Sequence, residues 1–519
     1  MKRFCFIVGG LLMSGMFATV NAQSAYDAGL FIGGELNGTA RYVGMGGAMG
    51  ALGGDLSVMS SNPAAMGIYR SNDLAVSFGF NNSTTESTFN NNMMKDDKTR
   101  ASFDQAGFVY SNKLGNYSTV RFFNLGFNYH KHKNFNRMFS MGGLLDGFSQ
   151  SQMMAGYLAD VDGMNSASEF DAVLGSDNPY KDYWGKYTAL SMMGARTRLV
   201  DWPDDQIGLV GWEGYNNLFH SEEWGGINQY DFSMAVNIQD RFYLGATFGV
   251  YDALYNRVSS YTEELNDDNG AENGGYTLDN KYRLSGTGFD VKLGMLFRPF
   301  EFSPFRIGVA VHSPIWYDMR EEYDATLSSD IAYWGETYTE TLSDYLPGEY
   351  LTYDYRMRTP WKYNVSMGTT FSKAVAIGAE YEYQDFSSTK LRDIDDFELG
   401  GEASMKECLQ GVHTLKLGIE TRMDNFMIRA GYNYSSAAYK KEAYNPLPVY
   451  GTRSDYENNK ERQTVTFGLG YHTGMFYADL AYKYDMYKSN FYAFEDIDLP
   501  ATKVDNDRHQ LLMTLGIRF

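Results

Sequence analysis

The chain has 519 residues, a formal net charge of -20 and only 44% hydrophobic residues, so its charge balance argues against a nucleic-acid partner. Aromatic residues are nevertheless abundant, with 41 Tyr and 34 Phe. This combination is typical of barrels whose strands turn every second residue to lipid and carry aromatic girdles at both membrane interfaces.

The first 22 residues predict a secretory signal. Lys2 and Arg3 precede an apolar run from Phe4 to Val20, and Val20-Asn21-Ala22 is a small-residue cleavage site. Beyond residue 22, no uninterrupted apolar stretch approaches the roughly 18 residues that a membrane-spanning helix requires. An exported chain of this kind that stays in a membrane would do so as a closed β-barrel.

Residues 23–73 follow the predicted signal and do not have the pattern of strands. Nine glycines punctuate short apolar pieces between Gly33 and Gly54, and Asn62-Pro63-Ala64 follows. Glycine at this density lets backbone pack closely against other backbone, as a plug inside a narrow barrel requires. We therefore expect residues 23–73 to form an N-terminal plug in the lumen, which we call a hatch.

Residues 74–519 contain about fourteen segments in which apolar and polar residues alternate, an even number within the range of bacterial barrels. The predicted strands are 74–80, 105–110, 120–130, 229–238, 241–251, 286–297, 305–313, 361–371, 374–386, 412–422, 425–436, 463–472, 475–487 and 509–519. Short connections alternate with long ones, the latter at 81–104, 131–228, 252–285, 314–360, 387–411, 437–462 and 488–508. Outer-membrane barrels have short periplasmic turns and long external loops, so both chain ends are expected on the periplasmic side.

The last strand alternates and ends in an aromatic residue. Leu511, Met513, Leu515 and Ile517 share a face with Phe519, while Arg518 belongs to the opposite row. A basic residue near the bilayer midplane costs about 2–4 kcal/mol, so rows that carry charge should face the lumen. A terminal phenylalanine on such a strand looks like the signal that outer-membrane barrels present to their assembly machinery.

The sequence resembles the FadL family of outer-membrane transporters for long-chain fatty acids and other hydrophobic compounds. The resemblance is carried by the stretch from Gly38 to Asp55 followed by Asn62-Pro63-Ala64, by His312-Ser313-Pro314 and by Thr359-Pro360-Trp361-Lys362. It spans nearly the whole chain after the signal. It implies a fourteen-stranded transmembrane barrel closed by an N-terminal hatch, lateral exit of the ligand through the wall, and multi-pass placement in the outer membrane of a Gram-negative bacterium.

Two sets of candidate ligand-binding residues follow from the residue types. Apolar and methionine-rich positions in the longest loop suit a surface that adapts to varied apolar ligands, and lumenal cations could neutralise a carboxylate on a lipidic ligand. These residues are Met141, Leu145, Phe148, Met153, Met154, Arg306, Lys416 and Arg429. The alternatives are that the loop residues pack the loop onto the barrel rim and that the cations form ion pairs with Glu380, Glu382, Glu420 and Asp479.

A lateral gate in the wall requires a strand whose hydrogen-bond ladder is locally broken. Phe122 and Phe123 are adjacent and apolar, so one must face inward, and Gly126 stands inside the same predicted strand. Glycine in a strand interior often marks a bulge, so these three residues are the predicted gate. The alternative is that Phe122 simply lines the lumen.

Three function classes stay open: a passive transporter of hydrophobic molecules, a general diffusion porin, and a surface adhesin or antigen. No catalytic motif, metal-ligand set or cofactor motif stands out, so an enzyme is not expected. The hatch favours the transporter. The expected partners are a hydrophobic small-molecule ligand, outer-membrane lipid and the barrel assembly machinery, with no nucleic acid, and we expect a monomer.

Overall fold

The computed structural model describes residues 25–115, 118–203, 208–267, 270–346, 351–372, 374–399, 402–445, 447–449 and 451–519. The predicted signal, residues 1–22, lies outside these residues. Among the residues that the structure describes, no helix is both long and apolar enough to cross a membrane.

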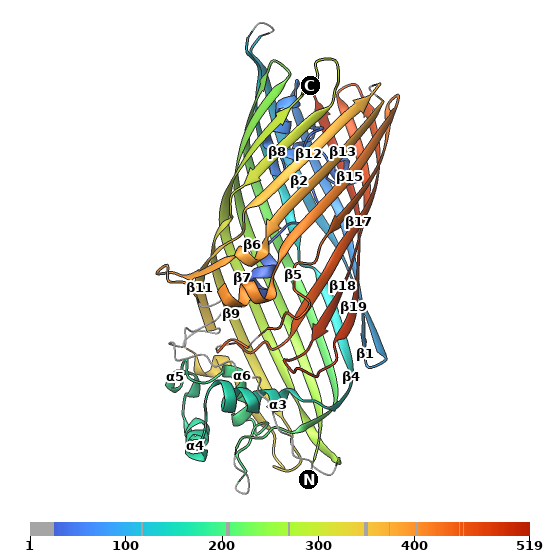
Figure 1. Ribbon diagram of the computed structural model, residues 1–519. Helices are drawn as coiled ribbons and strands as arrows, with labels where there is room; N and C mark the ends of the chain where they lie inside the picture. Colours follow the sequence, from blue (N-terminus) through green and yellow to red (C-terminus); the bar gives the residue numbers. More distant parts are fainter. Residues whose placement is uncertain are drawn as a thin grey trace.

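The strands of the described residues form one antiparallel sheet that closes because β1 pairs with β19 (Figure 1). The strands are β1 (Asp73–Phe89), β2 (Asn92–Lys113), β3 (Val120–Asn134), β4 (Arg137–Gly147), β5 (Glu213–Ile238), β6 (Phe242–Asn266), β7 (Glu272–Phe297), β8 (Arg306–His312), β9 (Trp316–Ser329), β10 (Tyr338–Thr341), β11 (Leu351–Arg358), β12 (Lys362–Phe371), β13 (Val375–Asp385), β14 (Lys390–Asp393), β15 (Gly411–Met423), β16 (Phe426–Ser435), β17 (Tyr456–Thr473), β18 (Phe476–Tyr492) and β19 (Thr502–Arg518). The pairs β8/β9 and β11/β12 are single spans interrupted at Pro314 and Pro360. The strands β4, β10 and β14 lie on the extracellular side and are not counted as membrane spans. Fourteen membrane-spanning strands remain, which confirms the predicted fourteen-stranded barrel.

Side chains alternate between a lipid-facing and a lumenal row as predicted. On β19, Leu511, Met513 and Leu515 are about 45% exposed, whereas Thr514 is fully buried. The exposed apolar row on β7 runs from Met295 to Phe289 and then changes to polar and, from Arg283, charged residues. The outer boundary of the membrane-facing band therefore lies near Phe289.

Several strands are much longer than the sequence pattern predicts. Segment 81–104 is not a loop: β1 and β2 continue to a tight turn at Asn90 and Asn91, which both have positive φ. Likewise β5, β6 and β7 are 26, 25 and 26 residues long and extend far beyond the membrane band on the extracellular side. The prediction of long external loops at 81–104 and 252–285 was wrong because strands that leave lipid no longer need an apolar outer row.

A helical cap, residues 150–196, lies at the extracellular end, opposite the C-terminus (Figure 1). It contains α3 (Gln150–Gly156), a π-helical turn (Tyr157–Val161), α4 (Ala167–Gly175), α5 (Pro179–Asp182) and α6 (Ala189–Arg196). Its apolar side chains share one hydrophobic core with the tall strands β5, β6, β7 and β9. The remaining short helices on this side are η4 (Leu342–Tyr345), η5 (Phe386–Ser388) and α7 (Glu402–Cys408).

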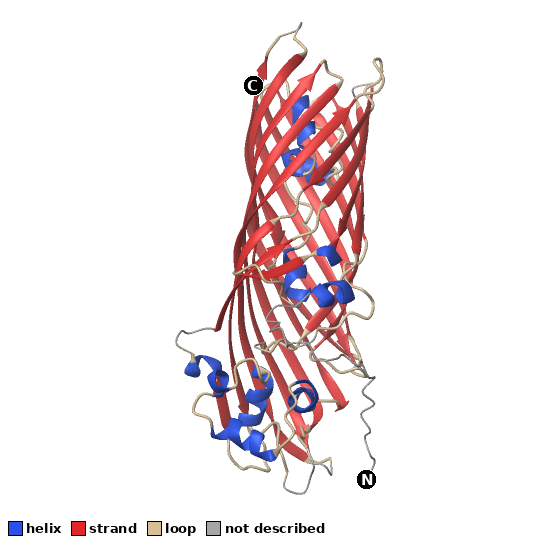
Figure 2. Cartoon of the chain, turned by 60° about the vertical axis from the view of Figure 1, so that its left-hand side comes forward, coloured by secondary structure: helices blue, strands red, loops and turns tan. Residues whose placement is uncertain are grey.

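The chain before β1 lies inside the barrel. It forms α1 (Ala25–Phe31), α2 (Ala40–Gly44), η1 (Leu56–Ser60) and η2 (Pro63–Ile68). Figure 2 shows helical turns enclosed by strands near the end that carries the C-terminus; there α2 packs on β17 and β18, and η2 packs on β5, β6 and β7. We call this segment, residues 25–72, the hatch.

The two ends of the described chain do not lie on the same side. Phe519 is hydrogen-bonded to Asn72 at the periplasmic end. In contrast, α1 lies among the extracellular loops, where Tyr26 stacks on Tyr439 and Asp27 pairs with Arg453 at 2.6 Å. The prediction that both ends are periplasmic was therefore wrong at the N-terminal side, because the hatch runs the length of the lumen before β1 begins.

Candidate functional site

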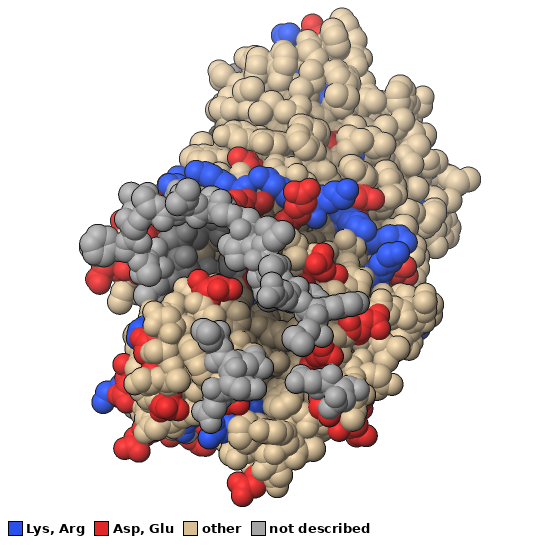
Figure 3. Space-filling view, turned by 60° about the horizontal axis from the view of Figure 1, so that its bottom comes forward, with Lys and Arg blue, Asp and Glu red and all other residues tan. Residues whose placement is uncertain are grey.

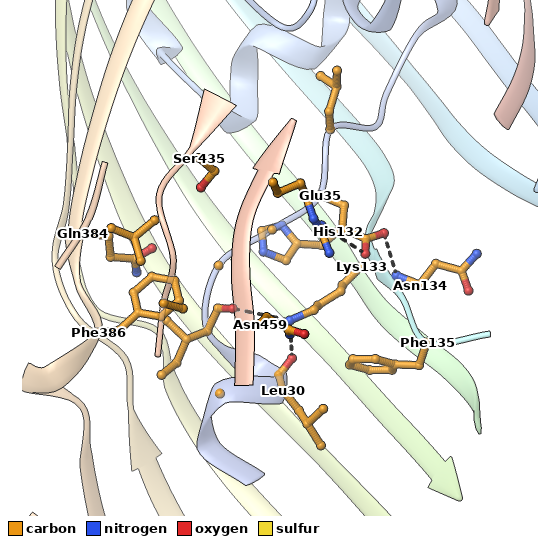
Figure 4. Close-up of a pocket in the computed structure, with 18 of the residues that line it drawn as sticks. Leu30, Glu35, His132, Lys133, Asn134, Phe135, Gln384, Phe386, Ser435 and Asn459 are labelled. Carbon is orange, nitrogen blue, oxygen red and sulfur yellow. Dashed lines mark hydrogen bonds and ion pairs between the residues drawn. The ribbon is translucent and has the colours of Figure 1, made fainter. Parts of the chain in front are cut away.

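A cavity of about 410 Å³ lies in the lumen between the hatch and the extracellular loops. Figure 4 shows that hatch residues Leu30 and Glu35 face His132, Lys133 and Phe135 at the end of β3. The Lys133 ammonium donates to the Leu30 carbonyl at 2.7 Å. The lining combines charged groups with aromatic rings, so the cavity suits a molecule that has both apolar and polar parts.

The Asn62-Pro63-Ala64 motif directly follows Ser60 and Ser61, which line this cavity. The Asn62 side chain is fully buried; its amide donates to the Gly50 carbonyl at 3.0 Å, and its oxygen accepts from the Ala64 N–H at 3.2 Å. Asn62 is thus the N-cap of η2 and ties two hatch segments together.

Wall glycines allow the hatch to sit directly on the strands. A side-chain carbon at Gly245 or Gly294 would overlap the Pro63 backbone or the Asn62 side chain. Those two glycines are directly paired on β6 and β7. Close approach of two backbones at this point is therefore possible only because the wall carries no side chain there.

A second glycine row seats residues 45–52 of the hatch. Gly368, Gly378, Gly418 and Gly431 are consecutive cross-strand partners on β12, β13, β15 and β16. A side-chain carbon at Gly378 or Gly418 would overlap a hatch carbonyl oxygen. The four glycines are present in the sequence, but their alignment across neighbouring strands is apparent only when the strand register is known.

Ion pairs link the hatch to the wall. The Arg41 guanidinium bonds both oxygens of Glu420 at 2.9 Å, and the same carboxylate accepts from Arg429 Nε at 2.7 Å. Arg429 is fully buried and also contacts Asp479 at 2.6 Å. These groups form a continuous charged network between α2 and strands β15, β16 and β18.

The three predicted lumenal cations are all engaged by the protein. Lys416 pairs with Glu380 at 3.0 Å and Glu382 at 2.8 Å, and Arg429 is held in the network just described. Arg306 donates to the Leu52 carbonyl at 2.8 Å. The geometry of Lys416 and Arg429 matches the ion-pair alternative, whereas Arg306 is held by backbone carbonyls of the hatch; Lys416 still lines the cavity.

The predicted loop residues lie in a core instead of on an open collecting surface. Met141, Leu145, Met153 and Met154 are at most 9% exposed, and Phe148 packs against the same hydrophobic cluster. They fasten β4 and α3 to the tall strands, which matches the packing alternative. The sequence could not separate the two roles because methionine spacing is the same in both.

The β3–β5 pairing has a register shift between Val120 and Phe122, beside the first predicted gate residue, but it is regular around Gly126. Phe122 faces the lumen, whereas Phe123 belongs to the outer row, and Gly126 is paired in continuous register with Val109 on β2 and Ser233 on β5. The bulge predicted at Gly126 is absent from this described region. Glycine leaves room there for the hatch, because a side-chain carbon would displace the ends of the Met59 and Met66 side chains.

The wall is irregular elsewhere, along a band that we call the proline seam: residues 313–315, 359–361 and 385–389. Side chains replace ladder carbonyls here: Val291 N–H donates to Ser313 Oγ at 2.9 Å, and Ile315 N–H donates to Thr359 Oγ1 at 2.8 Å. The Gln384 amide donates to the Pro360 carbonyl at 3.2 Å.

The proline seam separates the cavity from the outer face of the barrel. Ser313, Thr359 and Phe386 line the cavity on its inner side. Trp316 and Trp361 are 37% and 45% exposed on the outer side. Proline cannot donate to a ladder, and the sequence signal was present in Pro314 and Pro360. Only the register shows that the two interruptions are neighbours.

Within the described residues, neither the cap nor a cluster of possible metal ligands provides a second site. Burial raises the pKa of the Asp162 carboxyl in the cap to about 6, although the Thr188 N–H and hydroxyl both donate to it. Among the described residues, no group of three or more His, Cys, Asp or Glu side chains is arranged to hold a metal ion.

The closed sheet, its exposed apolar band and its polar, plugged interior define a transmembrane β-barrel of the bacterial outer membrane. The chain is similar to the solved structure of the Pseudomonas putida toluene transporter TodX, with 12% identity, 93% of this chain and 99% of that chain covered, and a TM-score of 0.46. It is similar to a Pseudomonas aeruginosa FadL homologue with 13% identity, coverage of 96% and 99%, and a TM-score of 0.46. For the Ralstonia pickettii toluene transporter TbuX the values are 14%, 93%, 99% and 0.42. No protein-family model and no curated protein matches the sequence.

Proposed function

We propose that this protein is a passive transporter that moves small hydrophobic molecules, including fatty-acid-like amphipathic ones, through the outer membrane. The observation that supports the proposal most directly is the lumenal cavity bounded below by the hatch and at its side by the proline seam. A bound molecule has two routes out of such a cavity: displacement of the hatch or separation of the wall.

The mixed lining supports an amphipathic ligand. Tyr251, Phe135 and Phe386 offer apolar surface, while Lys362 and His312 place cationic or hydrogen-bonding groups beside them. Lys362 and His312 are direct cross-strand partners on β12 and β8. An apolar body can therefore contact the rings while a polar end is held by the neighbouring strands.

The hatch argues against a general diffusion porin. A porin keeps a water-filled lumen, whereas here residues 40–68 pack against opposite sides of the wall, α2 on β17 and β18 and η2 on β5, β6 and β7. Hydrated solutes have no need of a hatch or of a weakened wall, but an apolar ligand gains from both, since lateral release spares it a passage through water.

We place the lateral route at the proline seam rather than at the third strand. Opening the seam breaks the side-chain hydrogen bonds at Ser313 and Thr359 and one backbone bond at each of these residues, to Val291 at 2.9 Å and to Ile315 at 3.0 Å, and leaves the regular ladders on either side intact. Opening the wall at Gly126 would require the loss of continuous backbone pairing on both sides. The first change exposes fewer unsatisfied backbone groups to lipid.

A matched pair of disulfides tests the route. In a Cys408→Ser background, Ile315→Cys with Thr359→Cys closes the seam, and Leu125→Cys with Met234→Cys, two outward-facing direct partners on β3 and β5, closes the regular wall beside Gly126. We expect the oxidised seam variant to bind a fluorescent long-chain fatty acid but to lose its uptake by cells, with recovery on reduction. The oxidised wall variant should transport normally.

The reverse pattern would place the gate at the third strand. Normal uptake by both oxidised variants would remove the lateral route altogether. If neither variant nor the unmodified protein bound the fluorescent fatty acid, the transport proposal itself would fail, and the extracellular cap would have to be tested as an adhesin.

A further inference from the structure

Four cations gather on the outer surface of two neighbouring strands, just above the membrane band. On β11 and β14, Arg356 stands directly opposite Arg392, and Arg358 stands directly opposite Lys390. The burial pattern of β11 assigns Arg356 and Arg358 to the exposed row. We call these four residues the cationic patch.

Like charges in directly opposed positions destabilise a sheet, so this arrangement is unfavourable for the isolated protein. Nearby acids relieve it only in part. Asp318 lies 3.4 Å from Arg356, Asp396 and Glu398 lie 2.9 and 3.3 Å from Arg392, and Glu398 also lies 3.6 Å from Lys390. Among the described residues, no carboxylate lies within 4.0 Å of the Arg358 guanidinium. Arg358 is therefore the member of the cationic patch that is best placed to meet an external anion.

The cationic patch lies at the height where a lipid headgroup would be. Arg358 is the cross-strand partner of Trp316, which in turn is the partner of Phe289 at the outer boundary of the apolar band. Figure 3 shows Lys and Arg gathered in a row where the tan wall of the barrel gives way to a charged surface. Exposed aromatic residues at this level mark the membrane interface.

Two strands on other sides of the barrel present acids at the corresponding level. The outward residues that follow the apolar rows on β6 and β19 include Asp252, Asp505 and Asp507. The charge asymmetry therefore follows the strands, not the height alone. A general attraction to the membrane surface would not require this concentration on two strands.

We propose that the cationic patch binds the phosphate groups of an anionic lipid in the outer leaflet. Guanidinium groups match phosphate oxygens with paired N–H donors, and a phosphate between the opposed cations would relieve their repulsion. The lipid's acyl chains would then lie along the aromatic surface of Trp316 and Trp361. This inference rests on the membrane placement of the barrel, but not on transport.

The direct test measures binding of diphosphorylated lipid A to the purified full-length protein in a neutral detergent, by native mass spectrometry at several salt concentrations. The variant carries Arg356→Gln, Arg358→Gln, Lys390→Gln and Arg392→Gln. The control neutralises four exposed cations elsewhere, with Lys95→Gln, Arg100→Gln, Lys488→Gln and Lys503→Gln.

We expect the patch variant to lose affinity by about 100-fold and to lose most of its salt dependence, while the control changes by less than about threefold. Dephosphorylated lipid A should bind the unmodified protein as weakly as the patch variant binds the phosphorylated form. Without lipid, the patch variant should be at least as resistant to heat as the unmodified protein, because the opposed like charges are gone.

Equal affinity of the patch variant and the unmodified protein would overturn the proposal, as would an equal loss in the control. If the fourfold variant did not fold, Arg358→Gln alone should still weaken binding by several-fold. Uptake of a fluorescent fatty acid should be unaffected by the patch substitutions, so a failed lipid test and a failed transport test remain distinguishable.

Discussion

Arg41→Met removes the ion pair that joins the hatch to the wall, and it should make the closed barrel open more often. Arg41 belongs to α2 and bonds both carboxylate oxygens of Glu420, while its third nitrogen donates to the Gly54 carbonyl at 2.7 Å. The side chains of Arg41 and Glu420 are only 20% and 13% exposed. A displaced hatch would lose these bonds, so they favour the closed state.

The magnitude follows from what remains after the substitution. Breaking a buried ion pair costs about 3–5 kcal/mol when the partner is left without a counter-charge. Glu420 still has Arg429 at 2.7 Å, so the loss should fall to about 2–3 kcal/mol. Since about 1.4 kcal/mol is a factor of ten in an equilibrium constant, the open population should rise by roughly 30- to 150-fold.

Single-channel recording in planar bilayers measures this change as the fraction of time spent in conducting states. The matched control is Arg70→Met, which makes the same substitution in the hatch but removes an exposed pair with Asp240. Exposed pairs contribute about 0–1 kcal/mol, so this control should change the open fraction by less than about fivefold. If the Arg41→Met protein opened no more often than the control, the ion pair between Arg41 and Glu420 would not be what holds the hatch closed.

Three further predictions address the hatch seat and the cap. Gly378→Ala should unseat the hatch and raise conductance, whereas Gly175→Ala, which meets no neighbouring atom, should not. Met154→Ala should destabilise the cap by about 2–5 kcal/mol, measured by hydrogen exchange, and leave fatty-acid affinity unchanged, because Met154 packs a core. The folded-state pKa of Asp162, about 6, exceeds its unfolded value of about 4, so cap stability should fall by about 1–2 kcal/mol as pH rises through 4 to 6. Asp162→Asn should abolish that dependence, and unchanged exchange rates between pH 4 and 7 in the unmodified protein would contradict it.

The sequence predicts the barrel well within the membrane and poorly above it. Lipid forces one row of every strand to be apolar, so the alternation at Leu511, Met513 and Leu515 reports both the strand and its register. Above Phe289 both rows meet water or protein, and Arg283 can occupy an outward position on β7 at no cost. The tall strands therefore lack the pattern that identifies the spans.

The candidate site depends on contacts between residues far apart in the chain, which explains why its parts were predicted unequally. Glycine density indicates a tightly packed hatch from composition alone, and Asn62-Pro63-Ala64 indicates it through the resemblance to the FadL family. The pairing of Arg41 with Glu420 and the adjacency of Pro314 and Pro360 require the strand register. At Gly126 the sequence alone is ambiguous, because a glycine inside a strand indicates either a bulge or the close approach of another segment. The contact with Met59 of the hatch shows that it is a close approach.

The central claim is that the hatch keeps the barrel closed and that the lumen is not a permanent pore. Single-channel conductance of the intact protein, compared with that of a variant lacking residues 33–66, tests it most directly. The structure predicts a nearly non-conducting intact protein and a stable open pore after the deletion, with the same heat-modifiable mobility as evidence that the barrel has assembled. A high, steady conductance in the intact protein, or an assembled deletion variant that stays closed, would contradict the account.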